Sequence, residues 1–279
     1  MMNRNWPSTE LTNEMHVIRV LAELRGKRWM CRGHSRCYGG LVPSIDRGRN
    51  LPRVEKLTLE RQSIDHFRST ARFFAADGER RALTDDLVAL MVLRHYRVPT
   101  RLLDWSLSPY VAAYFASCKY DADDGEIWAF DQDRYLLKGK QQWRRWKQTT
   151  IEGDRKSFQA ALTAFTIKEP PDWFVCYYYN AFDGFPRQNA QDGAYSLTAR
   201  FGRDHADALA NLLARRSYYH RYVVPASLKP ELRTFLRERH GIWEGSLFPD
   251  SAGAADCVQT GIFDAPAAPA RNARRRRAR

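Results

Sequence analysis

Apolar side chains recur every three or four residues in several stretches of the chain, which is the spacing of one face of a helix. This pattern predicts helices over residues 14–24, 53–74, 85–96, 109–116, 204–213 and 227–240. Residues with known preferences mark some of the ends. Ser108 and Pro109 suit the start of a helix, and Pro99 ends the helix before it. Gly241 fits a left-handed C-terminal cap.

Shorter apolar runs between turn residues predict strands over residues 29–31, 126–130, 174–178, 194–198 and 219–224. Because helices and strands follow one another in mixed order, we expect an α+β fold. It should be a single domain of five or six helices with a small sheet of short strands. The stretch from Pro99 to Trp105 is expected to be a loop between two packed helices.

The expected organisation has four parts. They are a flexible leader at 1–13, a folded domain at 14–262, a helical excursion on its surface at 131–170, and a disordered Arg-rich tail at 263–279. Residues 265–279 of the tail hold six Arg and no acid, so they carry +6 of the formal net charge of +13.

Composition narrows the class of protein. With 44% hydrophobic residues among 279, the chain can bury a core and is not largely disordered. No apolar run approaches the roughly 20 residues of a membrane span. The five Cys are scattered and odd in number, which excludes a disulfide framework and favours the cytoplasm. Cys31, His34 and Cys37 lack a second ligand pair at suitable spacing, so no metal site is predicted.

Two motifs are similar to those of a known family. Cys31-Arg32-Gly33, followed by residues 41–44, resembles the opening of the FRG domain, which is named for an aromatic-Arg-Gly triplet. Residues 94–105, RHYRVPTRLLDW, resemble its central signature, Gln-His-Tyr-Gly-x-Pro-Thr-Arg-Leu-Leu-Asp-Trp. Elements near 187–195 and 241–250 are similar too, so the resemblance spans 29–255. Cys31 replaces the aromatic residue, Arg94 replaces Gln, and Arg97 replaces Gly.

The resemblance implies a shared fold and a site around these motifs. Arg32 is interpreted as an anion-binding residue beside Gly33, which permits close approach of the backbone; the alternative is a surface Arg paired with an acid. His95 is a candidate proton shuttle, and the alternative is a capping or core histidine. Gln191 as a catalytic residue and Arg187 as a ligand-binding residue rest on the family pattern alone.

The central motif has two interpretations. In the functional one, Arg101 grips a phosphate or carboxylate, Asp104 orients Arg101, and Trp105 stacks on a ring of the ligand. Tyr96 and Thr100 would contribute further ligand contacts. In the alternative, Asp104 caps the next turn, Arg101 pairs with it, and Trp105 fills the core. Arg94 and Arg97 add positive charge here, so an anionic ligand is expected.

A weaker candidate for nucleic-acid binding lies in the excursion. Trp143 and Trp146 alternate with Arg144 and Arg145, and aromatics interleaved with cations can stack bases and hold phosphates. The alternative is an amphipathic surface helix that docks its tryptophan pair. The Arg-rich tail is either a nonspecific nucleic-acid binder or a solubilising end.

Three classes of function stand beside one another. The first is an ADP-ribosyltransferase-like enzyme using NAD, in which Arg32 holds the pyrophosphate, Trp105 or Tyr96 stacks on the nicotinamide, and Gln191 orients the ribose. The chain has no Glu-x-Glu pair of the kind many such enzymes use. The second is a non-catalytic module that binds a nucleotide or nucleic acid. The third is a structural or protein-interaction domain. The sequence gives no oligomeric state.

Overall fold

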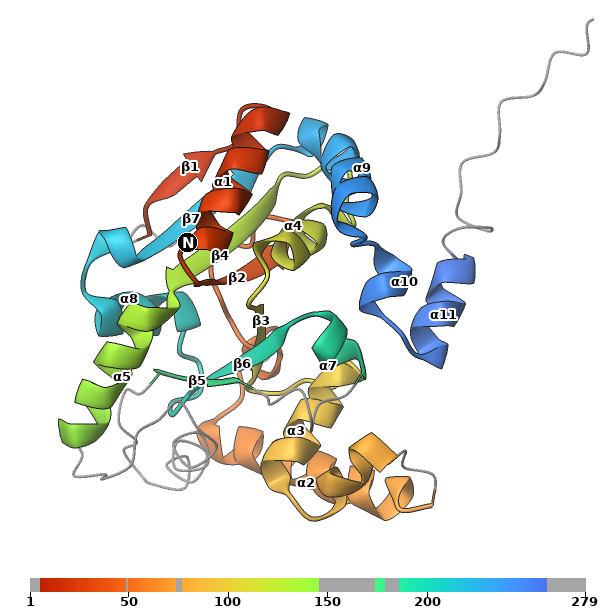
Figure 1. The fold of residues 1–279 in the computed structure, drawn as a ribbon. Helices are drawn as coiled ribbons and strands as arrows, with labels where there is room; N and C mark the ends of the chain where they lie inside the picture. Colours follow the sequence, from red (N-terminus) through yellow and green to blue (C-terminus); the bar gives the residue numbers. More distant parts are fainter. Residues whose placement is uncertain (1–5, 49, 74–76, 146–173, 179–185, 260–279) are drawn as a thin grey trace, which may run out of the picture.

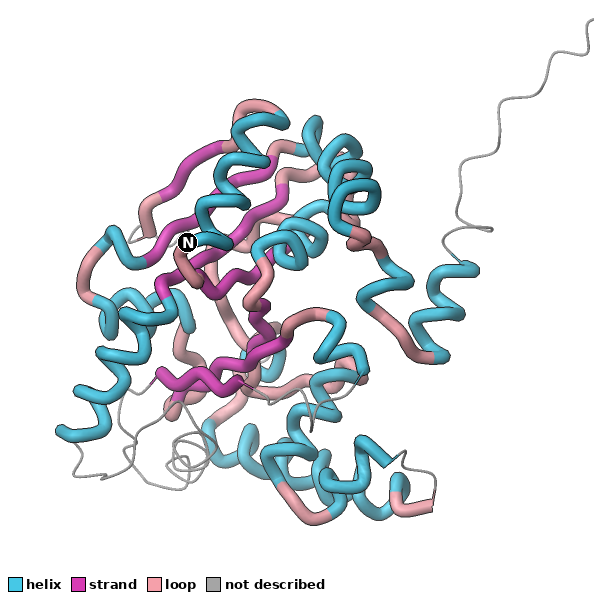
Figure 2. The backbone as a smooth tube through the Cα atoms, viewed as in Figure 1, coloured by secondary structure: helices cyan, strands magenta, loops and turns pink. Residues whose placement is uncertain are grey.

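The computed structural model describes residues 6–48, 50–73, 77–145, 174–178 and 186–259. Its centre is a sheet of seven strands in the order β1-β7-β4-β2-β3-β6-β5, drawn magenta in Figure 2. Only the pairing of β1 with β7 is parallel, and the other five are antiparallel. The strands are β1 (Ser8–Glu10), β2 (Trp29–His34), β3 (Leu103–Ser106), β4 (Gly125–Asp131), β5 (Phe174–Tyr178), β6 (Gly193–Thr198) and β7 (Tyr219–Val224).

Helices cover both faces of this sheet, as Figure 1 shows. The helices are α1 (Glu14–Gly26), α2 (Arg53–Ala71), α3 (Asp86–His95), α4 (Pro109–Ser117), α5 (Gln132–Arg145), α7 (Pro186–Ala190), α8 (His205–Leu213), α9 (Lys229–His240), α10 (Glu244–Leu247) and α11 (Ser251–Val258). The predicted α+β class is confirmed. Among the described residues, no helix has the length and apolar character needed to cross a membrane.

Three apolar clusters divide the core. The first lies between the sheet and helices α1, α4 and α9, and the second lies under α5 and α8 on the opposite face. Successive residues of a strand point to opposite faces, so Cys31 enters the first cluster and Met30 the second. The third cluster joins α2 and α3 to Tyr195 and Leu197 of β6. Strand β6 therefore carries its own helical layer, separate from that of β2.

Several predicted helix ends are confirmed. Helix α4 begins at Pro109, and the Ser108 side chain accepts the N–H of Val111. Gly241 caps α9 with φ +64°, and Ile242 N–H bonds back to the helix at 3.0 Å. Helix α9 begins at Lys229, two residues after the predicted start at residue 227, because a 3₁₀ turn over Ala226–Leu228 comes first.

Two expectations about loose segments are wrong. Residues 8–10 of the expected leader form β1, which pairs with β7, while Trp6 and Leu11 on either side are buried. Residues 103–106, expected in a loop, form β3 within the sheet. The excursion begins as helix α5, whereas its residues 146–170 and the tail beyond 259 lie outside the described residues.

Gly33 decides how closely α4 approaches the sheet. A Cβ atom at this position would overlap the main-chain oxygen of Ala112 and lie 2.7 Å from the Ala116 nitrogen. Gly125 on the neighbouring strand β4 likewise faces the Ala116 carbonyl. The two glycines form a flat floor for the helix. The space beside Gly33 is therefore filled by α4, on the face of β2 opposite to Arg32.

We expect Gly33→Ala to lower the free energy of unfolding by about 3 kcal/mol, because neither the helix backbone nor the strand can move aside locally. Gly26→Ala is the matched control, since nothing lies within 4 Å of its added Cβ at the end of α1. The control should leave stability unchanged or slightly raised. Urea unfolding measures both, and equal effects of the two substitutions would contradict the role of Gly33.

Candidate functional site

The sheet is nearly interrupted between β2 and β3. These strands share one residue pair, Cys31 with Ser106, whereas β2 and β4 pair along six residues. The guanidinium of Arg32 bridges the weak junction. Its Nη1 donates to the main-chain oxygen of Asp104 and lies 3.6 Å from the Asp104 carboxylate. A side chain thus ties the two strands where the backbone ladder is shortest.

Two more arginines lie close to Arg32, and one of them contacts the same carboxylate. Arg94, at the end of α3, donates from Nε and Nη2 to Asp104 Oδ2 at 2.8 and 2.6 Å. Arg47 lies on the surface nearby, and its Nε donates to the Val42 carbonyl at 2.8 Å. Arg32, Arg47, Arg94 and Asp104 are called the arginine cluster from here on. Three guanidinium groups and one carboxylate give it a net charge of +2.

The pKa shifts in the cluster combine the effect of burial with the charges of its members. Burial lowers the pKa of Arg32 to about 10, although Asp104 acts in the opposite direction. Desolvation, and then the charge of Arg94, lower the pKa of Arg47. Burial alone would raise the pKa of Asp104, but Arg94 and Arg32 outweigh it, so that pKa is lowered. The Asp104 side chain is 44% exposed, so solvent reaches the centre of the cluster.

A second set of side chains holds the Arg32 guanidinium through its Nε. Its Nε–H donates to His34 Nε2 at 2.8 Å, and His34 Nδ1 lies 2.9 Å from Glu126 Oε1. Because arginine has no acceptor, His34 Nε2 must accept and Nδ1 must carry the proton given to Glu126. Arg221 donates to the other Glu126 oxygen at 3.3 Å. His34, Glu126 and Arg221, from β2, β4 and β7, are called the relay.

The relay keeps a neutral imidazole between charged groups. Burial, with the charge of Arg32 adding to it, lowers the pKa of His34 to about 4. Burial would raise the pKa of Glu126, yet the hydrogen bond from His34 helps to lower it. At neutral pH the hydrogen-bonded groups therefore follow one another as the Arg221 cation, the Glu126 anion, the neutral His34 ring and the Arg32 cation. This order holds the Arg32 guanidinium at the edge of the arginine cluster.

The other catalytic candidates meet elsewhere. Arg187 donates from Nε and Nη2 to the Asp250 carboxylate at 2.9 and 2.8 Å, and His95 Nε2 lies 3.6 Å from the same carboxylate. Gln191 Nε2 donates to the Leu247 carbonyl at 3.0 Å. These contacts fasten α7 and the end of α3 to the segment holding α10 and α11. The described side-chain contacts of His95 and Gln191 thus reach the segment at 247–250, although the charge of Asp104 also acts on His95.

The central motif is mostly packed inside. Arg101 is 5% exposed in its side chain and forms an ion pair with the buried Glu60 of α2, not with Asp104. Trp105 is 3% exposed and donates from Nε1 to Ser196 Oγ at 2.7 Å, so a ligand cannot stack on it. Thr100 is buried as well. Among these candidates, Asp104 alone lies in the arginine cluster.

Tyr96 and Arg97 lie on the surface just after α3. The Tyr96 ring is 53% exposed, and its hydroxyl donates to Glu79 at 2.5 Å. Arg97 has φ +64°, the left-handed region that favours glycine, which explains the Gly at this place in the FRG signature. Of the two arginines that depart from that signature, Arg94 therefore belongs to the cluster, and Arg97 occupies a turn.

The weaker nucleic-acid candidates are not placed by the structure. Trp143, Arg144 and Arg145 end α5, but their side chains, and all of Trp146, lie outside the described part.

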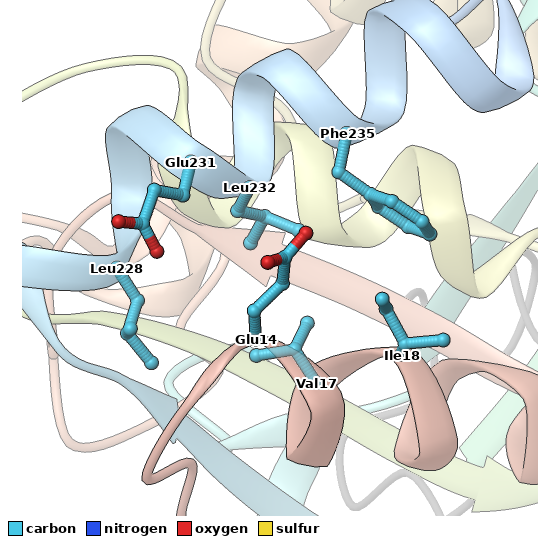
Figure 3. Close-up of a pocket in the computed structure, with 7 residues that line it drawn as sticks. All are labelled: Glu14, Val17, Ile18, Leu228, Glu231, Leu232 and Phe235. Carbon is cyan, nitrogen blue, oxygen red and sulfur yellow. The ribbon is translucent and has the colours of Figure 1, made fainter.

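Two hollows in the described part lie apart from the arginine cluster. Figure 3 shows the one between α1 and α9, where Glu14 and Glu231 stand beside apolar side chains. Its volume of about 10 Å³ is room for one water. The other, about 520 Å³, is an open groove between α10 and α11 that reaches Asp250. Within the described residues, no group of three or more His, Cys, Asp or Glu side chains is placed to hold a metal ion.

Comparison with known proteins gives a single result. Residues 27–125 match the family model of the FRG domain, a stretch that includes β2, β3, α3 and α4, all four members of the arginine cluster, and His34 of the relay. No curated protein and no solved structure matches the chain.

The relay predicts a pH-dependent stability. Since the His34 pKa is about 4 in the folded chain and 6.5 for an ordinary imidazole, the unfolded chain takes up the proton first. Stability from the neutral ring is complete above about pH 6.5 and is lost as pH falls toward 4. His34→Gln keeps an acceptor for Arg32 and a donor for Glu126 without titrating. It should reduce the slope of unfolding free energy against pH by about 1.4 kcal/mol per pH unit.

Urea unfolding at a series of pH values measures this slope. His66→Gln, on the exposed side of α2, serves as the control and should keep the parent slope. A His34→Gln protein with the parent slope would show that the buried ring is not what loses stability in acid.

Proposed function

We propose that this chain, which contains an FRG domain, binds the phosphate groups of a small nucleotide-type ligand at the arginine cluster. The observation that carries the proposal is the charge imbalance there. Arg32 and Arg94 share the carboxylate of Asp104, and the described part of the chain offers Arg47 no ion pair. A bound anion would supply the missing negative charge. The planar guanidinium fork matches the oxygens of a phosphate in geometry as well as in charge.

The size of the cluster favours a compact anion. Arg32 and Arg94 share one carboxylate, and Arg47 is near enough for its charge to act on both of them. A nucleic-acid backbone carries evenly spaced single charges and is usually bound by an extended row of cations. A diphosphate places its charges on adjacent groups, which suits three guanidinium groups within one site. The structural role of the cluster does not account for Arg47, which lies on the surface and forms no ion pair with an acid among the described residues.

The geometry favours binding over turnover. Both oxygens of Glu126 and both ring nitrogens of His34 already have partners, so these groups are engaged in holding Arg32. The Gln191 side chain is engaged by its bond to the Leu247 carbonyl. ADP-ribosyl transfer from NAD would need a side chain that orients the ribose beside the cluster. Release of nicotinamide from NAD by the purified protein would overturn this preference for a binding module.

Inorganic pyrophosphate is the direct probe of the proposal. We expect it to bind in calorimetry at low salt, with an affinity that falls as salt is raised. Arg47→Gln should weaken binding at least tenfold, because one charge-assisted hydrogen bond to phosphate contributes about 1.5–3 kcal/mol. Arg61→Gln is the matched control, an exposed arginine on α2 that pairs with Asp65 and Asp86.

Arg47 is chosen because the only described hydrogen bond of its side chain reaches the nearby Val42 carbonyl, so loss of the guanidinium should leave the fold intact. An unchanged melting temperature of Arg47→Gln establishes this point. The proposal is overturned if pyrophosphate fails to bind at millimolar concentration, or if Arg47→Gln and Arg61→Gln bind it equally well.

A further inference from the structure

An exposed aromatic ring stands next to the arginine cluster. Tyr38 is 58% exposed, and the guanidinium carbon of Arg47 lies 6.0 Å from the centre of its ring. The ring of His34 meets it edge-on, with the centres 5.4 Å apart. The phenol group of Tyr38 therefore borders the cluster on one side and the relay on the other, with most of its surface in solvent.

The backbone around Tyr38 is held in place. Its N–H donates to Glu126 Oε1 at 3.2 Å, so the relay anchors both Arg32 and this tyrosine. Gly39 follows with φ +73°, a left-handed turn that suits glycine. The next turn is closed by Asp204, which accepts the N–H of Leu41 at 3.0 Å. A large apolar ring kept on the surface by such a framework calls for an explanation other than packing.

Stacking on a flat ligand provides that explanation. An aromatic platform beside cations is the arrangement by which proteins hold a base and its phosphates together. Tyr38 and the arginine cluster are adjacent through Arg47, and a base and its diphosphate are joined by one ribose. Trp105, the stacking residue expected from the sequence, is buried, and Tyr96 stands against Glu79 after α3.

We infer that Tyr38 is the platform on which the base of a nucleoside diphosphate stacks while its phosphates occupy the arginine cluster. This inference rests on the proposed phosphate binding and adds to it a preference for ligands that carry an aromatic base. Arg47 then has two roles, since it contacts phosphate and lies against the edge of the platform. The proposed ligand is then a nucleotide, and no longer any compound that carries phosphate groups.

Calorimetry with ADP and with pyrophosphate separates the two proposals. ADP should bind the parent protein about tenfold more tightly than pyrophosphate, the contribution expected of one stacked base. Tyr38→Ala should lose this advantage while its pyrophosphate affinity stays at the parent value. Tyr38→Phe, which keeps the ring, should retain it. Tyr120→Ala is the matched control, a 47% exposed tyrosine that lies against Arg36, outside the cluster.

The outcomes are distinct. Binding of pyrophosphate with no added affinity for ADP, or an ADP affinity that Tyr38→Ala leaves unchanged, overturns the platform and leaves phosphate binding in place. If neither compound binds, both proposals fall together. Equal losses with Tyr38→Ala and Tyr120→Ala would also overturn the assignment, because the effect would then not belong to the ring beside Arg47.

Discussion

The junction between β2 and β3 is the constraint around which the described structure is arranged. One backbone pair joins these strands, and the Arg32 guanidinium adds the bond to Asp104 that the ladder lacks. Strands β4 and β7 lie on one side of the junction, and β6 and β5 lie on the other. The helices divide in the same way, with α1 and α9 over the first half and α2 and α3 against the second. The Arg32 side chain therefore lies at the junction between two halves of one sheet that are covered by different helices.

Such a junction is costly in isolation, because a guanidinium placed among side chains loses its hydration. The relay offsets part of this cost by giving Arg32 a neutral acceptor and by giving Glu126 three donors. The remaining excess of positive charge is what a structural role alone would not require. A protein selected only for stability would be expected to place a second carboxylate near Arg47. Its absence from the described surroundings of Arg47 is the physical argument for a ligand.

The sequence predicts where helices and strands lie along the chain better than it predicts which residues contact one another. The start of α4 at Pro109 and the cap of α9 at Gly241 follow from local residue preferences, so the sequence alone predicts them. The sequence does not identify β3 as a strand, because Leu102 and Leu103 fit a packed loop and a strand equally well. Arg101 and Arg94 show the same limit. Both lie in one motif, yet Arg101 pairs with Glu60 and Arg94 with Asp104.

The relay could not be found from local patterns, since its members come from three strands far apart in the chain. The strand register places Arg32 opposite Trp128, and Trp128 opposite Arg221. These positions on β2, β4 and β7 lie side by side only because of how the strands pair. Alternation along β2 did hold a usable signal. Met30, Arg32 and His34 share one face, so a histidine two residues after the arginine was a natural neighbour for it.

The same alternation explains why an arginine and a glycine stand side by side in the first motif. Arg32 turns toward the charged side of the sheet, while Gly33 turns toward α4 and admits its backbone. Helix α4 directly follows β3 and packs closely against β2 at Gly33, so the glycine that admits the helix and the arginine that reaches Asp104 lie at the same junction. A loss of ligand binding caused by a larger residue at Gly33 would reflect the fold, whereas a loss caused at Arg47 or Tyr38 would reflect the ligand, because those two side chains stand on the surface.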